Sequence, residues 1–142
     1  MPLATASERR RNTNPRKVYP ADPGLIHAFD PSGSPNLGHA LETAVFNELV
    51  RRGAEVGYVR TEEGWEVDFH ARIPGERALL IQVCAELTSQ DVLARELRAL
   101  ESARRLHPRA ERLLIVPTHE EARRAPTDGI RVVPAYAWFL EG

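Results

Sequence analysis

The segment from Ala78 to Cys84 is short and almost wholly apolar, and it restricts the possible folds more than any other part of the chain. It follows a turn at Pro74-Gly75-Glu76. A short apolar run after such a turn is typical of a central strand that is covered on both faces. Because two covered faces require packed layers on each side of a sheet, we expect a layered α/β domain with this strand near its middle.

The flanking sequence supplies the other layers. Trp65 to Ile73 alternates between apolar and polar residues, which predicts a strand with Glu66, Asp68 and His70 on one face. Helical spacing of apolar residues predicts two amphipathic helices. The expected helices are 36–52 and 89–106, with a brief helix at 120–124 and a helical turn at 135–140; further strands are expected at 56–60, 113–116 and 130–133. The order is therefore helix, three strands, helix, two strands and a final helical turn, around a mixed central sheet.

The N-terminal residues 1–15 differ in composition from the rest. They show no apolar periodicity and contain the cluster Arg9, Arg10 and Arg11. Such a segment is typical of a flexible basic tail, and the alternative is an arm that contacts phosphate, because clustered arginines attract polyanions. Residues 16–142 are enough for one domain.

Composition narrows the classes of function. The net charge of −1 gives no overall field that would attract nucleic acid or an anionic membrane. No apolar run approaches the ~20 residues that span a bilayer, and no signal peptide is evident. The single cysteine, Cys84, excludes an internal disulfide, so we expect a cytoplasmic protein with no membrane partner. No phosphate-binding loop of the Gly-x-x-x-x-Gly-Lys type is present, so no ATPase activity is expected.

Oxygen-bearing side chains converge in the expected fold. Glu42 lies beside the apolar stripe of the first helix, and Asp68 and Gln82 are near cross-strand neighbours if their strands pair. Carboxylate and amide oxygens suit magnesium or manganese, which can polarise a phosphodiester and activate water. The alternative for each carboxylate is a structural, hydrogen-bonded or solvent-facing role.

Five short motifs occur in an order that resembles a known family. The motifs are Pro15-Arg16-Lys17-Val18-Tyr19 with Asp22-Pro23-Gly24-Leu25, Gly38-His39-Ala40-Leu41-Glu42, Glu66-Val67-Asp68-Phe69, Leu80-Ile81-Gln82-Val83-Cys84, and Gly129-Ile130-Arg131-Val132-Val133-Pro134-Ala135. They resemble the C-terminal domain that follows an AAA+ or P-loop ATPase module in many bacterial and archaeal proteins. That domain is similar to the PD-(D/E)XK nuclease superfamily, so the resemblance implies a restriction-endonuclease-like fold over about residues 15–141.

The resemblance transfers the family's site only in part. Its helix glutamate corresponds to Glu42 and its strand aspartate to Asp68, whereas its usual Glu-Val-Lys corresponds to Gln82-Val83-Cys84. In active relatives the lysine positions the attacking water, and a thiol offers no fixed positive charge. The only lysine of the chain is Lys17, near the N-terminus, so we expect none in the core. Electrostatic replacement by an arginine is left open.

These observations predict a degenerate, catalytically silent nuclease-like domain that acts as a binding or regulatory module. Two alternatives stay open: a weakly active magnesium- or manganese-dependent DNA nuclease, and a pure interaction domain. Nucleic acid and a partner ATPase are the expected contacts, and a homodimer is compatible with the sequence. The predicted residues are Glu42, Asp68, Gln82 and Cys84 for the degenerate site, the first three of these for any metal, and Arg9, Arg10, Arg11 and His70 for nucleic acid.

Overall fold

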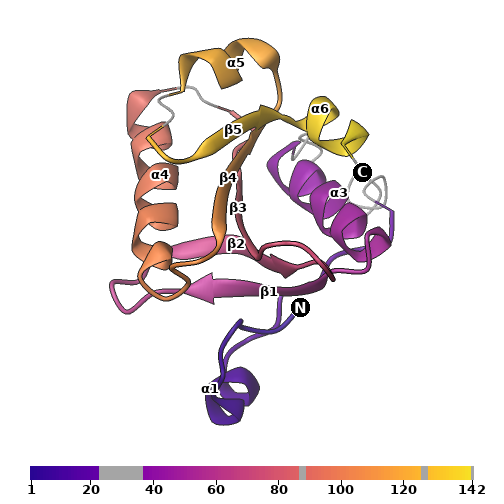
Figure 1. Ribbon diagram of the computed structural model, residues 1–142, viewed down its shortest axis with the longest axis vertical. Coiled ribbons are helices and arrows are strands. Elements are labelled where there is room, and N and C mark those ends of the chain that lie inside the picture. Colours follow the sequence, from indigo (N-terminus) through magenta and orange to yellow (C-terminus); the bar gives the residue numbers. More distant parts are fainter. Residues whose placement is uncertain (23–36, 87–88, 126–127, 142) are drawn as a thin grey trace, which may run out of the picture.

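The protein is built around one five-stranded mixed sheet (Figure 1). A computed structural model describes residues 1–22, 37–86, 89–125 and 128–141. The strands are β1 (Glu55–Arg60), β2 (Glu66–Arg72), β3 (Leu79–Val83), β4 (Glu111–Val116) and β5 (Arg131–Pro134), and they lie in that order. β1 pairs with β2 and β2 with β3 in antiparallel fashion, whereas β3 pairs with β4 and β4 with β5 in parallel. The predicted α/β class and mixed sheet are confirmed.

Helices cover both faces of the sheet. The helices described are α1 (Glu8–Thr13), α3 (Leu37–Arg51), α4 (Gln90–Arg104), α5 (His119–Arg124) and α6 (Ala135–Leu140). α3 and α6 lie on one side of the strands and α4 on the other (Figure 1). In β3, Ile81 packs into the α3-side core and Leu80 into the α4-side core. The prediction of a central strand covered on both faces is therefore correct. Within the described ranges no helix is long and apolar enough to cross a membrane.

Local sequence signals explain where these helices begin. The Ser89 hydroxyl accepts a hydrogen bond from Val92 N and caps α4. Thr118 and Glu121 form a reciprocal capping box at the start of α5. Such caps satisfy N–H groups that have no partner within the helix, so they stop each helix from extending backward.

The N-terminal residues, whose composition is typical of a flexible tail, begin with a contact to the sheet. Leu3 forms a parallel bridge with Tyr58 on the outer edge of β1. Ala4 N donates to Tyr58 O at 2.7 Å, and Tyr58 N donates to Pro2 O at 3.1 Å. After this contact the chain forms the exposed helix α1, which projects away from the sheet (Figure 1). The segment therefore covers an edge strand that would otherwise present unpaired backbone groups.

An irregularity in β2 changes which face its side chains occupy. Gly57 pairs with His70 and Val59 pairs with Val67, so two steps along β1 match three along β2. The extra residue on β2 is a β-bulge, which breaks the alternation of faces. Phe69 consequently packs on the α3 side, whereas Val67 packs on the α4 side. The expectation of strict alternation from Trp65 to Ile73 is wrong at this point.

The bulge also separates His70 from Asp68. His70 pairs with Leu80, whose side chain lies in the α4-side core, and cross-strand partners share a face. His70 is 8% exposed and its ring lies 4.2 Å from that of His107. The prediction that His70 lies beside Asp68 and contacts nucleic acid is therefore not supported by its position.

Gly57 tests the N-terminal pairing, because a Cβ at this position would lie 3.0 Å from Pro2 O and 3.1 Å from Ala4 Cβ. We expect Gly57→Ala to lower the free energy of unfolding by about 1–3 kcal/mol, as overpacking does. It should also speed hydrogen exchange at the Ala4 amide. Urea denaturation and amide exchange measure both effects.

The matched control is Glu55→Gln, an exposed position on the same strand, which should change stability by no more than about 0.5 kcal/mol. Unchanged exchange at Ala4 in Gly57→Ala would show that residues 2–4 do not pair with β1.

Candidate functional site

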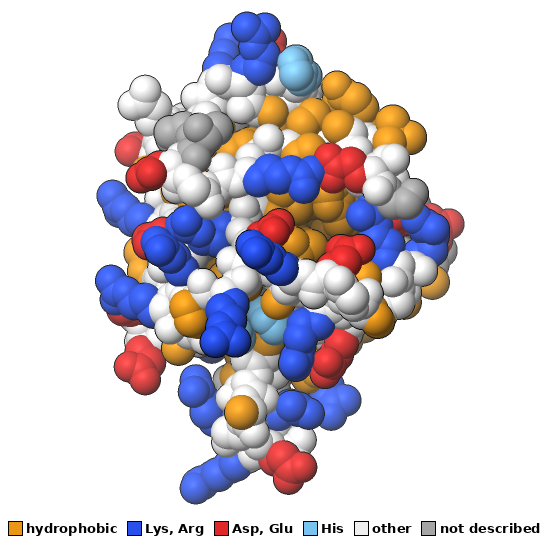
Figure 2. Space-filling view, viewed as in Figure 1, with side chains coloured by type: hydrophobic (Ala, Val, Ile, Leu, Met, Phe, Trp, Pro, Cys, Tyr) orange, Lys and Arg blue, Asp and Glu red, His pale blue; other side chains and the backbone are white. Residues whose placement is uncertain are grey.

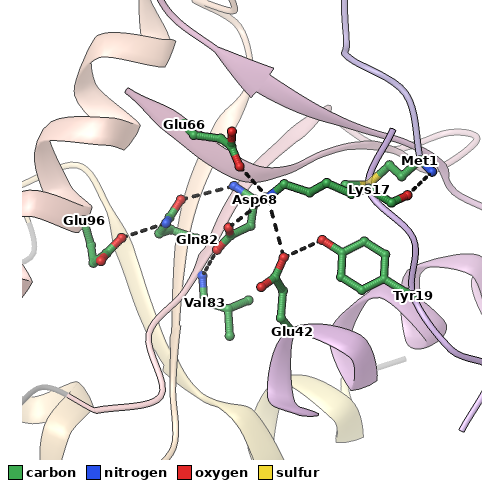
Figure 3. Close-up of polar contacts among 9 residues, drawn as sticks. All are labelled: Met1, Lys17, Tyr19, Glu42, Glu66, Asp68, Gln82, Val83 and Glu96. Atoms are coloured by element: carbon green, nitrogen blue, oxygen red, sulfur yellow. Dashed lines mark hydrogen bonds and ion pairs between the residues drawn. The ribbon is translucent and has the colours of Figure 1, made fainter. Parts of the chain in front are cut away.

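The only lysine of the chain lies at the centre of an acidic cluster (Figure 3). Lys17 Nζ is 2.6 Å from Glu66 Oε1 and 3.6 Å from Glu42 Oε1. It is also 3.6 Å from Asp68 Oδ1. The expectation of a site without lysine is wrong, because the N-terminal segment brings Lys17 back to the strands. We call Lys17, Glu42, Glu66 and Asp68 the Lys17 cluster.

The N-terminal segment holds Lys17 in place through its backbone. Lys17 N donates to Met1 O at 3.0 Å, and Tyr58 Oη donates to Pro15 O at 2.8 Å. The Lys17 ammonium also lies 5.6 Å from the centre of the Tyr58 ring, within cation–π range. Burial alone would lower the pKa of Lys17, but the hydrogen bond to Glu66 and the charges of Asp68 and Glu42 together raise it. The side chain is therefore a cation at neutral pH.

Tyr19 supports the helix side of the cluster. Its ring stacks on Phe46 of α3 with a centroid distance of 4.6 Å, and its hydroxyl donates to Glu42 Oε1. Burial and the bond to Glu42 raise the pKa of Tyr19 above its ordinary range, so it stays a donor. Asn47 Nδ2 donates to Ala21 O at 2.9 Å and fixes the chain beyond Tyr19. Glu42 is thus held between a hydroxyl and an ammonium.

Asp68 is the most perturbed carboxyl of the site. Its Oδ2 accepts a hydrogen bond from Val83 N at 2.9 Å. This bond lies just beyond the end of the backbone pairing between β2 and β3. Burial raises the pKa of Asp68 to about 7, and the charge of Glu42 adds to this effect. The Val83 amide and Lys17 oppose it only in part. Asp68 therefore exchanges a proton near neutral pH.

Gln82 connects the cluster to the opposite helix. Gln82 Oε1 accepts a hydrogen bond from Asp68 N at 3.2 Å, and Gln82 Nε2 donates to Glu96 Oε2 at 2.7 Å. Glu96, on α4, is in turn paired with Arg95 at 2.7 Å. Asp68 and Gln82 are near neighbours, as predicted, but both polar ends of Gln82 are already engaged. This path runs from α4 to the Lys17 cluster (Figure 3).

The predicted metal ligands do not form a coordination set. Gln82 directs its oxygen to Asp68 N, and the cation beside Glu42 and Asp68 is the Lys17 ammonium. Among the described residues no group of three or more His, Cys, Asp or Glu is arranged to hold a metal ion. Magnesium or manganese therefore does not fit Glu42, Asp68 and Gln82 as they are placed.

Cys84 stands apart from the Lys17 cluster. It is buried in the α4-side core, and its Sγ donates to Glu86 O at 3.4 Å. Burial raises the pKa of the Cys84 thiol, which favours the unreactive neutral form. Arg9, Arg10 and Arg11 belong to the exposed helix α1, which projects away from the sheet (Figure 1), and none of them is a member of the cluster.

Four residues of the site had no predicted role: Lys17, Tyr19, Glu66 and Glu96. Each carried a signal in the sequence. Lys17 and Tyr19 belong to one of the ordered motifs, Glu66 precedes Asp68 by two positions on a strand, and Glu96 interrupts the apolar stripe of α4. A charged residue in an apolar stripe requires a buried partner, which here is Gln82.

Comparison with known proteins places the chain in a family. Residues 37–138 match the family described as "Domain of unknown function (DUF4143)", which covers most of the chain. The chain belongs to this family. The family is found in AAA-ATPase-associated proteins.

One relative spans nearly the whole chain. "Uncharacterized protein MJ1544" of Methanocaldococcus jannaschii is 37% identical over 148 aligned residues, which include 97% of this chain. The chain spans 32% of that relative's length. No solved structure matches the chain.

The raised pKa of Asp68 predicts a pH dependence of stability. Because its pKa is about 7 in the folded state and 3.8 ordinarily, Asp68 binds its proton more tightly when folded. The stability that this tighter proton binding contributes is fully present below about pH 4 and is lost as the pH rises through 7. We expect Asp68→Asn to flatten the decline in unfolding free energy between pH 4 and pH 7. Urea denaturation across this range measures it, and an equal slope in both proteins would contradict the assignment.

Lys17→Met leaves three carboxylates without their cation. Removing one partner of a buried pair costs about 3–5 kcal/mol, and because Lys17 is 25% exposed we expect a smaller loss, about 2 kcal/mol, at pH 7. The loss should shrink toward pH 4 as Asp68 gains its proton. Arg16→Met is the matched control, because Arg16 precedes Lys17 in the sequence and its side chain is exposed. Equal effects of the two substitutions would rule out a specific role for Lys17.

Proposed function

We propose that this chain is a degenerate nuclease-like domain that does not cleave nucleic acid and acts as a binding or regulatory module. The observation that carries the proposal is Gln82, a neutral side chain at the position where the resembled family has a glutamate, with both its amide oxygen and its amide nitrogen engaged. The ordered motifs that resemble the PD-(D/E)XK superfamily, and the α/β sheet with Asp68 on β2 and Gln82 on β3, support the nuclease-like part.

The chemistry of the two exchanged positions supports the loss of cleavage. Gln82 is neutral, and its oxygen and nitrogen are occupied by Asp68 N and Glu96. Cys84 has no positive charge and lies in the α4-side core. Phosphoryl chemistry requires stabilisation of developing negative charge, and neither residue offers it.

Three contacts are proposed for the module. Occurrence of the family in AAA-ATPase-associated proteins supports an ATPase as the protein partner. The exposed α1 helix with Arg9, Arg10 and Arg11 supports a sequence-independent contact with the nucleic-acid backbone. A second copy of the chain is the third contact to be tested.

The second candidate function is a weak metal-dependent nuclease. The observation in its favour is Lys17, whose ammonium lies 3.6 Å from Asp68. This lysine, from the N-terminal segment, supplies the positive charge that Cys84 lacks. The unsuitable position of Gln82 argues against it, so we rank it below the silent module.

A cleavage assay separates the two functions. Plasmid and single-stranded DNA are incubated with the protein in magnesium or manganese. We expect no cleavage above that of Asp68→Ala and no saturable change of Tm with manganese. Cleavage that persists in Asp91→Ala, an exposed aspartate on α4, but disappears in Asp68→Ala and Lys17→Met would overturn the silent module in favour of the nuclease.

Binding is measured separately from cleavage. Anisotropy of a labelled oligonucleotide should show weak, salt-sensitive binding that falls when Arg9, Arg10 and Arg11 are replaced by glutamine. Concentration-dependent dimerisation without such binding would instead favour a pure interaction domain.

A further inference from the structure

A cleft of about 550 Å³ lies where the N-terminal segment meets β1, β2 and the chain after α4. This volume is within the roughly 300–1,000 Å³ typical of small-molecule sites. Its apolar wall includes Leu3, Val56, Leu106 and Pro108. No member of the Lys17 cluster lines it, and Arg11 is the one residue that it shares with the nucleic-acid contact proposed above.

The charged side chains of the cleft are mostly cationic. Arg11, Arg72 and Arg109 line it, and Glu55 is the one acidic residue among the described lining. Arg72 Nη2 lies 3.5 Å from Glu55 Oε2, a solvent-exposed pair that holds the guanidinium only weakly. Three guanidinium groups against one carboxylate leave an excess of two positive charges. Figure 2 shows Lys and Arg side chains gathered on this lower part of the molecule, around α1.

Two histidines form a neutral aromatic part of the wall. The rings of His70 and His107 lie 4.2 Å apart at 33°. Burial lowers the pKa of His70 to about 4, with His107 and Arg72 adding to the effect, and burial also lowers the pKa of His107. Each neutral imidazole offers one N–H donor and one acceptor, so this wall can contact an uncharged polar or planar group.

We propose that this cleft binds a small organic phosphate monoester, whose phosphate lies among Arg11, Arg72 and Arg109 and whose organic part lies against the apolar and imidazole wall. A phosphate monoester carries about −1.5 to −2 charges at pH 7, which matches the excess of two positive charges. Guanidinium groups bind phosphate oxygens through paired N–H donors. The apolar wall favours an organic phosphate over the inorganic ion.

The test uses AMP as the probe, with adenosine and inorganic phosphate as its two halves. Isothermal titration calorimetry should show saturable binding of AMP, and binding of either half should be at least about tenfold weaker, the loss expected when a charge-assisted contact is removed. Arg72→Gln and Arg109→Gln, each alone, should weaken AMP binding about tenfold, since each removes a contact to a charged group. Arg98→Gln, exposed on α4 and outside the cleft, is the matched control and should bind as the wild type does.

Each other outcome overturns the proposal. Absence of AMP binding, equal binding of adenosine, or an equal loss in Arg98→Gln would each show that the cleft does not recognise phosphate. If a single-stranded oligonucleotide bound more tightly than AMP, and its binding also depended on Arg72 and Arg109, the cleft would be a site for a nucleic-acid backbone and not for a small phosphate ester. Circular dichroism of each variant confirms that the arginines act on binding and not on folding.

Discussion

The contact of the Lys17 ammonium with three carboxylates is the interaction on which the rest of this site depends. Glu42 comes from α3, and Glu66 and Asp68 come from β2, so like charges from two layers meet at one point. Without a cation their mutual repulsion would oppose the packing of α3 on the sheet. Lys17 offsets this repulsion, and the raised pKa of Asp68 removes part of it. The helix, the strand and the N-terminal segment are therefore held together electrostatically as well as by their apolar surfaces.

The β-bulge in β2 is what allows this meeting. A strand without the extra residue would place either Asp68 or Phe69 on the wrong face of the sheet. With the bulge, Phe69 packs in the α3-side core while Asp68 reaches Lys17 on the same side. On the other side of β2, the pairing with β3 ends at Phe69 and Ile81, and beyond it Asp68 N bonds to the Gln82 side chain and Val83 N bonds to the Asp68 side chain. Two side chains thus satisfy backbone N–H groups where the β2–β3 ladder ends.

The fold was largely predictable because its signals are local. Apolar spacing identified α3 and α4, and the apolar run at Leu80 and Ile81 identified a strand covered on both faces. The site was predictable only in part. Glu42 and Asp68 were placed correctly near each other, but the missing cation comes from Lys17, which is 25 residues from one and 51 from the other in sequence. The spacing of apolar residues along a chain does not indicate a contact between charged residues that are so far apart in sequence. A bulge likewise leaves no trace in an alternating pattern, which is why His70 was assigned to the wrong face.

The N-terminal segment links two features that the sheet alone would keep apart. Its first residues pair with β1 and line the cationic cleft, α1 contributes Arg11 to the same cleft, and its last part places Lys17 among the carboxylates. Because Lys17 N is bonded to Met1 O, the two ends of the segment are tied to each other. Displacement of this segment would therefore move Arg11 out of the cleft and Lys17 away from Asp68 together. Coupling of this kind needs no path through the core, since one continuous piece of chain belongs to both places.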